Sequence, residues 1–168
     1  MKSKPANFTA WFFALIFAQA FVLDPVLLGV NYAPLVYVLL LIFLPNYWPS
    51  WVVLLAGFII GLIIDLFYLS GGIHAAASLV VCFLRPNFIR TAYKGTLKPN
   101  ELVIENESFD SLIVYIFLTT AIHHFVLLAF VVFDWARIGW FLSAWGTNTL
   151  LTFVTCTLLV IITRKGRL

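Results

Sequence analysis

WVVLLAGFIIGLIIDLFYLSGGIHAAASLVVCFLRPNFIR, residues 51–90, is the stretch around which the rest of the chain is organised. It contains two apolar runs separated by Ser-Gly-Gly at 70–72, where a turn is expected. Residues four apart lie on one face of a helix, so Gly57, Gly61 and Asp65 form a single stripe. Small residues admit a close neighbour, and an acid within an apolar helix needs a polar partner. The stripe is therefore predicted to be a contact seam.

The composition of the chain indicates a membrane protein. Of its 168 residues, 63% are hydrophobic and only 10% are charged. A soluble domain carries about a quarter charged residues, so this chain has too little polar surface to cover a globule in water. The apolar runs are continuous and do not alternate, which favours helices over a β-barrel. We expect one all-α domain over residues 1–168, a compact bundle of about six membrane-spanning helices.

The six predicted spans are defined by apolar runs of about 20 residues between polar breaks. Their approximate ranges are 8–23, 27–44, 51–69, 73–89, 112–133 and 140–162, with one long polar loop at 91–110. The first run resembles a secretory signal that ends near 18–20, but it continues past that site, so a retained span is the preferred interpretation. Ala10, Ala14 and Ala18 lie four apart in it, which suits either helix packing or the docking of a partner subunit.

The distribution of charge predicts the orientation. The net charge is +3, and nine of the ten basic residues lie at the N-terminus, in and before the 91–110 loop, or at the C-terminus. With six spans these three regions fall on one side, so the positive-inside rule places both termini and the loop in the cytoplasm. This clustering at span ends argues against a nucleic-acid partner. The loop is basic first and acidic afterwards, which suits either a solvated linker or contacts with lipid and a basic partner.

Four polar positions within or beside the spans are predicted to come together. The rise per residue of a helix places Asp65, the pair His123–His124 and Asn148 at similar depths in the outer half of the bilayer. These residues form either a polar clasp that fixes helix packing or a proton or ligand site. In the fourth predicted span, the run from the Gly-Gly turn to Arg85 is too short to cross the hydrocarbon core. We therefore expect the Arg85 side chain to snorkel to the cytoplasmic membrane surface.

Sequence motifs of soluble enzymes are missing. The chain contains no glycine-rich phosphate loop, no His-Glu-x-x-His and no Gly-x-Ser-x-Gly. Cys82 and Cys156 lie in apolar runs without other cysteines or histidines at ligand spacing, so free buried thiols are expected. We predict neither catalytic residues nor a metal or cofactor. A membrane enzyme assembled from scattered residues stays open as an alternative.

The motif Gly57-x-x-x-Gly61-x-x-x-Asp65, followed by Ser-Gly-Gly-Ile-His-Ala at 70–75 and by Arg85, resembles the MreD family of bacterial rod-shape proteins. The resemblance in size, number of spans and basic tail extends over nearly the whole chain, whereas the motif covers only the third and fourth spans. It implies a non-enzymatic scaffold of the elongation machinery in the bacterial inner membrane, and a fold similar to the S component of energy-coupling-factor transporters.

The resemblance also implies partners. MreC, a bitopic protein, would bind directly, and RodA, its transpeptidase and the MreB filament would be reached through it. Self-association stays open. The residues predicted to meet the partner belong to the glycine stripe and to the Ser-Gly-Gly turn that hinges the two apolar runs. They are Gly57, Gly61, Asp65, Gly71 and Gly72. A polar pocket is predicted from Asp65, His74, His123, His124 and Asn148. The alternative function is a substrate-binding membrane subunit of a vitamin-type transporter.

Overall fold

The chain folds as an all-α helical bundle. The structure, a computed structural model, describes residues 13–19, 34–94, 108–132 and 135–165. Residues 13–19 are helical. The labelled helices that follow are α3 (Val38–Ile42), α4 (Ser50–Tyr68), α5 (Ile73–Ala92), α6 (Phe109–Val132), the 3₁₀ turn η3 (Trp135–Arg137) and α7 (Ile138–Lys165).

Three of the described helices are long and apolar enough to cross a bilayer. They are α4, α6 over residues 109–131 and α7 over residues 138–163. At the rise per residue of an α-helix, each of them is about as long as the hydrocarbon core is thick, or longer. The helix α5 is also 20 residues long, but it carries Arg85 and Arg90. The chain is thus a multi-pass membrane protein with three candidate spans among the described residues.

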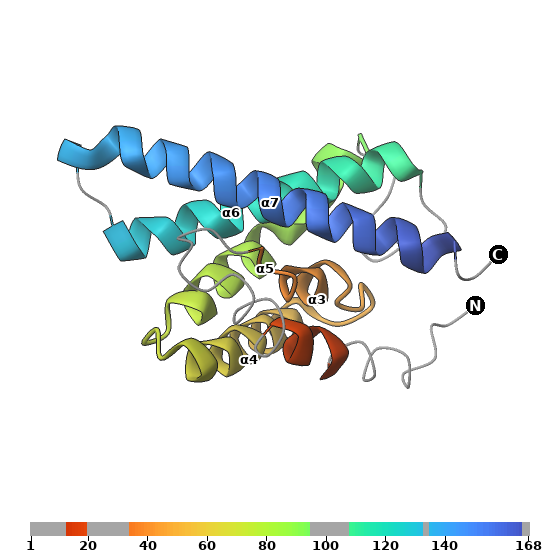
Figure 1. The fold of residues 1–168 in the computed structure, drawn as a ribbon. Helices are drawn as coiled ribbons and strands as arrows, with labels where there is room; N and C mark the ends of the chain where they lie inside the picture. The colour runs from red at the N-terminus through yellow and green to blue at the C-terminus, as the bar shows by residue number, and fades with distance from the viewer. Residues whose placement is uncertain (1–12, 20–33, 95–107, 133–134, 166–168) are drawn as a thin grey trace.

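Successive long helices pack against one another in chain order. Figure 1 shows α6 and α7 side by side with opposite directions, α5 beneath them and α4 on the far side of α5. The indole Nε1 of Trp145 on α7 donates to the Ala121 carbonyl of α6 at 2.8 Å, which ties this pair together. The short helix α3 lies between the layers, where it contacts both α5 and α6.

The second predicted span differs from the described structure. Within 34–44, only the five residues of α3 are helical, and the chain from Leu35 to Ile42 is buried throughout. Pro34 lacks an N–H and fixes its φ angle, which disfavours a helix that runs through it. The Leu35 N–H donates instead to the Thr152 hydroxyl of α7, at 3.0 Å. This segment is apolar because it forms the core of the bundle; its residues 27–33 lie outside the described part.

Other predictions for the spans fall partly outside the described residues. Of the first predicted span, the structure describes residues 13–19, in which the Ala14 side chain is exposed; Ala10 lies outside. The helix α5 passes through Pro86 and ends at Ala92, and α6 begins at Phe109. The central part of the polar loop, 95–107, is not described. Cys82 and Cys156 are buried free thiols.

Candidate functional site: a helix hinge and a polar core

The glycine stripe of α4 is a seam, and α5 of the same chain fills it. A Cβ built on Gly61 would lie 2.5 Å from both the Cα of Ala75 and the carbonyl oxygen of His74. A Cβ built on Gly57 would overlap the Sγ of Cys82. Both glycines are buried. The helices α4 and α5 therefore touch backbone to backbone at Gly61 and backbone to side chain at Gly57, and a partner helix from another protein would have to displace α5 to reach these positions.

The turn between the two helices requires left-handed backbone conformations. Gly71 and Gly72 have φ angles of +69° and +98°, and Leu69, which ends α4, has a φ of +52°. Glycine adopts such angles without a steric penalty, whereas leucine does so at some cost. No atom lies within 4 Å of a Cβ built on either glycine. The two glycines therefore serve the chain reversal and not close packing.

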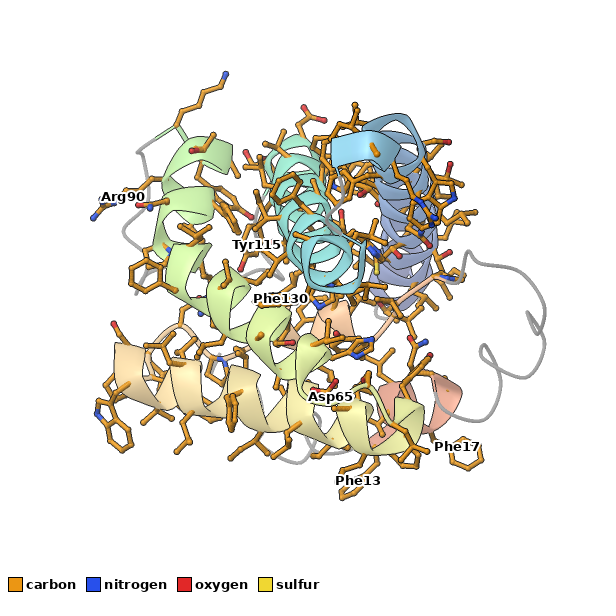
Figure 2. The ribbon with its side chains drawn as sticks, turned by 90° about the vertical axis from the view of Figure 1, so that its left-hand side faces the viewer. Phe13, Phe17, Asp65, Arg90, Tyr115 and Phe130 are labelled. Carbon is orange, nitrogen blue, oxygen red and sulfur yellow. The ribbon has the colours of Figure 1, made fainter. Side chains whose placement is uncertain are left out.

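Asp65 lies at the hinge, the place where the end of α4 meets the start of α5 (Figure 2). Its Oδ1 accepts hydrogen bonds from the Ser70 hydroxyl at 2.5 Å and from the His74 backbone N–H at 3.0 Å. Its Oδ2 accepts the backbone N–H of Ala75 at 2.8 Å. The Nδ1 of the His74 ring also lies 3.0 Å from Oδ1. Asp65 is only 5% exposed, and the hinge supplies its polar partners.

Asp65 acts as the N-terminal cap of α5 from outside that helix. The first backbone N–H groups of a helix have no partner within it, and the residue before α5 is Gly72, which has no side chain to provide one. A carboxylate at this place also interacts favourably with the positive end of the helix dipole. The sequence predicts that Asp65 needs a polar partner, and the structure identifies the partners. They are backbone and side-chain donors of the same chain.

A second set of polar side chains lies in the interior next to the hinge. The Tyr37 hydroxyl lies 2.7 Å from Nε2 of His123, and Nε2 of His124 lies 2.7 Å from the Thr152 hydroxyl. Tyr37 links this set to the hinge, since its ring is 6.0 Å from the ring of His74 and 5.4 Å from that of His123. All of these side chains are buried. Polar groups from α5, α6, α7 and the start of α3 therefore converge in the core.

The structure brings together four of the five residues predicted for a polar pocket. Asp65 contacts His74 directly, and Tyr37 links them to His123 and its neighbour His124. Asn148 is buried as well, but its amide donates to the Ala144 carbonyl of its own helix, at 2.9 Å.

Sequence reasoning missed Tyr37 and Thr152. The sequence signal that could have indicated Tyr37 is its place within an apolar run. A tyrosine hydroxyl that is buried with such a run needs a hydrogen-bond partner. Thr152 is one of several threonines in its helix, and nothing in its spacing distinguishes it from the others.

Arg85 does not snorkel, and that prediction is wrong. Its side chain is buried, and its Nε donates to the Tyr115 hydroxyl at 3.0 Å. Its Nη2 donates to the carbonyls of Ile42 at 3.4 Å and Leu44 at 2.5 Å, at the end of α3. Because α3 ends inside the bundle, its last carbonyls need donors, and a cation also suits the negative end of a helix. Tertiary packing created this requirement, which the sequence of α5 alone does not contain.

The chemistry of these residues is that of internal hydrogen bonding. Among the described residues no three histidines, cysteines or acids lie together in a way that could hold a metal ion. One ring nitrogen, Nδ1 of His123, is buried without a partner in the described part of the chain. Each of the other polar side chains discussed above makes at least one hydrogen bond to another side chain or to a backbone group.

Comparisons of the chain with protein-family models, with curated proteins and with solved structures found no match. The fold and the hinge define the class of the protein, an all-α membrane bundle whose acid and arginine bind the ends of neighbouring helices.

Proposed function

We propose that this protein is a non-enzymatic scaffold subunit of the bacterial rod-shape machinery, which binds MreC and supports lateral peptidoglycan synthesis and cell shape. The resemblance of residues 57–75 to the MreD family suggests this role. RodA, its transpeptidase and MreB would be reached through MreC. The proposed location is the inner membrane, with both termini in the cytoplasm.

The observation that carries the proposal is how the interior polar groups are used. The residues of the motif, from Gly57 to Ala75, form one packed hinge, in which Asp65 is bonded to its own chain at 2.5–3.0 Å. Further inside, Tyr37 and His123 bind each other at 2.7 Å. These groups stabilise one arrangement of helices, as a scaffold needs. A bundle of this kind meets its partners sideways, at its lipid-facing surface.

The stripe itself is no longer the best surface for MreC, because α5 occupies it. The outward faces of α4, α6 and α7 are surfaces that a single-span partner could reach. On α4, Phe58, Leu62 and Leu66 are exposed by 40%, 41% and 70%, and on α7, Leu150, Val154 and Leu158 are exposed by 61%, 46% and 53%. Such apolar faces suit either lipid or a partner helix, so the choice between them is experimental.

The proposed orientation agrees with the ends of the helices. Arg90 lies in the last turn of α5, and α7 ends at Lys165. The helices α4 and α6 begin at the end of the bundle where α5 and α7 finish, because successive helices run in opposite directions (Figure 1). Basic residues therefore gather at one end, which the positive-inside rule assigns to the cytoplasm.

Photo-crosslinking in intact cells tests the proposal. A photoreactive residue is placed at Leu62 on α4, at Val154 on α7, or at the fully buried Ile64 as the matched control on α4. We expect one of the outward positions to give a crosslinked species that contains MreC, and Ile64 to give none. If the outward positions along α4, α6 and α7 all fail to capture MreC at normal expression, the proposed function is wrong.

The second candidate is a transport subunit that binds a small molecule. The observation that favours it is the convergence of Tyr37, His74 and the His123–His124 pair from three separate segments, with one His123 nitrogen unpaired within the described residues. Native mass spectrometry of the protein purified from membranes separates the two candidates. A retained bitopic protein supports the scaffold, whereas a retained small molecule that is lost in Tyr37→Phe supports transport.

A further inference from the structure

An open groove of about 320 Å³ lies between the beginning of α4 and the second half of α5. Figure 2 shows these two helices diverging from the Asp65 hinge. The groove begins at Cys82, just beyond the contact with Gly57, and lies where the helices separate. Its wall includes Ser50 and Val53 of α4, Phe83 and Arg85 of α5, and Trp48 of the turn before α4. This volume is at the lower end of the range for small-molecule sites.

The groove contains a buried cation, Arg85, that makes no ion pair with any residue that the structure describes. Arg85 lines the groove although it is only 5% exposed. Its Nε and Nη2 bind a hydroxyl and two carbonyls, all of which are neutral, and its Nη1 donates no hydrogen bond within the described residues. Asp65, the buried acid among the described residues, lies at the hinge end of α4 and accepts hydrogen bonds from Ser70, His74 and Ala75, so it is not available to Arg85. A buried charge of this kind is costly unless an anion comes close to it.

Further donors border the same groove. The helix α4 has 19 residues and begins at Ser50, and the Val52 N–H donates to the Pro49 carbonyl at its start. The N–H groups of Ser50 and Trp51 precede that bond and have no carbonyl partner within the helix. The N-terminus of a helix attracts anions through these groups and through its dipole. A guanidinium group and a helix N-terminus thus border one space.

The position of the groove suits a lipid headgroup. Tyr47 and Trp51 beside it are exposed by 75% and 68%, and such aromatic side chains favour the depth of the headgroups. Arg90 lies further along α5, and Figure 2 shows it pointing away from the bundle, where it could attract acidic lipids. The 71% exposed Phe83 continues the groove as an apolar surface toward the membrane interior.

We propose that this groove binds the phosphate of an anionic membrane lipid, between the Arg85 guanidinium and the N-terminus of α4, with the acyl chains along Phe83. The inference requires only that the protein spans a membrane, and it does not depend on binding to MreC. A free phosphate ion shares the headgroup chemistry but cannot use the apolar wall.

The test uses the full chain purified in detergent and native mass spectrometry, with phosphatidylglycerol and phosphatidylcholine of identical acyl chains as probes. Replacing Arg85 would remove the donors at the end of α3 and could unfold the protein. Ser50→Glu is the better variant, because Ser50 is exposed and an acid in the first turn suits the helix dipole, while its charge repels a bound phosphate. Ser108→Glu is the matched control, an exposed serine at the start of α6 and outside the groove.

We expect the wild type and Ser108→Glu to retain phosphatidylglycerol in preference to phosphatidylcholine. In Ser50→Glu, retention of phosphatidylglycerol should fall about fivefold, the size of effect that one charge has near an anionic headgroup. Retention of phosphatidylcholine should not change. Equal retention of the two lipids by the wild type, or an equal loss in both variants, would overturn the proposal. Inorganic phosphate that binds as well as the lipid and displaces it would overturn the assignment to a lipid.

Discussion

Gly61→Ala should destabilise this protein more than any other single methylene-sized change in α4. The added Cβ would lie 2.5 Å from the Cα of Ala75, whereas ordinary contacts of a Cβ begin at 3.4 Å. The helices must therefore separate by about 0.9 Å, the difference between 3.4 Å and 2.5 Å. The atoms that would be met are backbone atoms, which cannot move aside as a flexible side chain does.

The expected magnitude has two parts. Overpacking of a tight contact costs about 1–3 kcal/mol. Separation of the helices also pulls the Asp65 carboxylate, one turn further along α4, away from the N–H groups of His74 and Ala75. Loss of a helix cap costs about 0.5–2 kcal/mol. We therefore expect a decrease of about 1.5–5 kcal/mol in the free energy of unfolding, the sum of these two ranges.

Reversible unfolding in mixed detergent and dodecyl sulfate micelles measures this difference. The matched control is Gly146→Ala on α7, where no atom lies within 4 Å of the added Cβ. There the alanine should be neutral or should stabilise the helix by up to about 1 kcal/mol. Combining Gly61→Ala with Asp65→Asn should cost less than the sum of the single changes, because both disturb one contact. Equal stabilities of Gly61→Ala and Gly146→Ala would refute the reasoning.

The remaining predictions concern the same interior. Gly57→Ala should destabilise the protein less than Gly61→Ala, because the atom that the new Cβ meets is a side-chain sulfur, that of Cys82. Adding Cys82→Ala to Gly57→Ala should partly restore stability in the same unfolding assay. Failure of this rescue would mean that the contact is not where we place it. Asp65→Asn should destabilise by about 1–3 kcal/mol, since one carboxylate oxygen that accepts a backbone N–H becomes a donor; hydrogen exchange should then increase first at the start of α5. Tyr37→Phe should cost a similar amount, about 1–3 kcal/mol, because Nε2 of the fully buried His123 loses its partner. An unchanged unfolding midpoint in this variant would show that the bond does not contribute.

Several features could be predicted from the sequence because they depend on local chemistry. The apolar composition and the long runs without charge predict a helical membrane protein, since each span must satisfy its backbone within one helix. The small residues at 57 and 61 predict a close helix contact, and the glycines at 71 and 72 predict the turn, which uses positive φ angles. The acid at 65 predicts a polar partner. Its depth in the predicted span, similar to that of His123 and His124, predicts that these side chains lie in the same part of the bundle.

The identity of each neighbour was decided only by the tertiary structure. A stripe of small residues is equally suited to a helix of the same chain or of another, and packing assigned it to α5. The run before residue 45 has the hydropathy of a span, but α3 is buried within the bundle, because apolar residues suit a protein core as well as lipid. Arg85 became a buried cap because α3 ends beside it. Sequence periodicity specifies which face of a helix is small, apolar or charged, whereas the partner of that face depends on how distant segments pack.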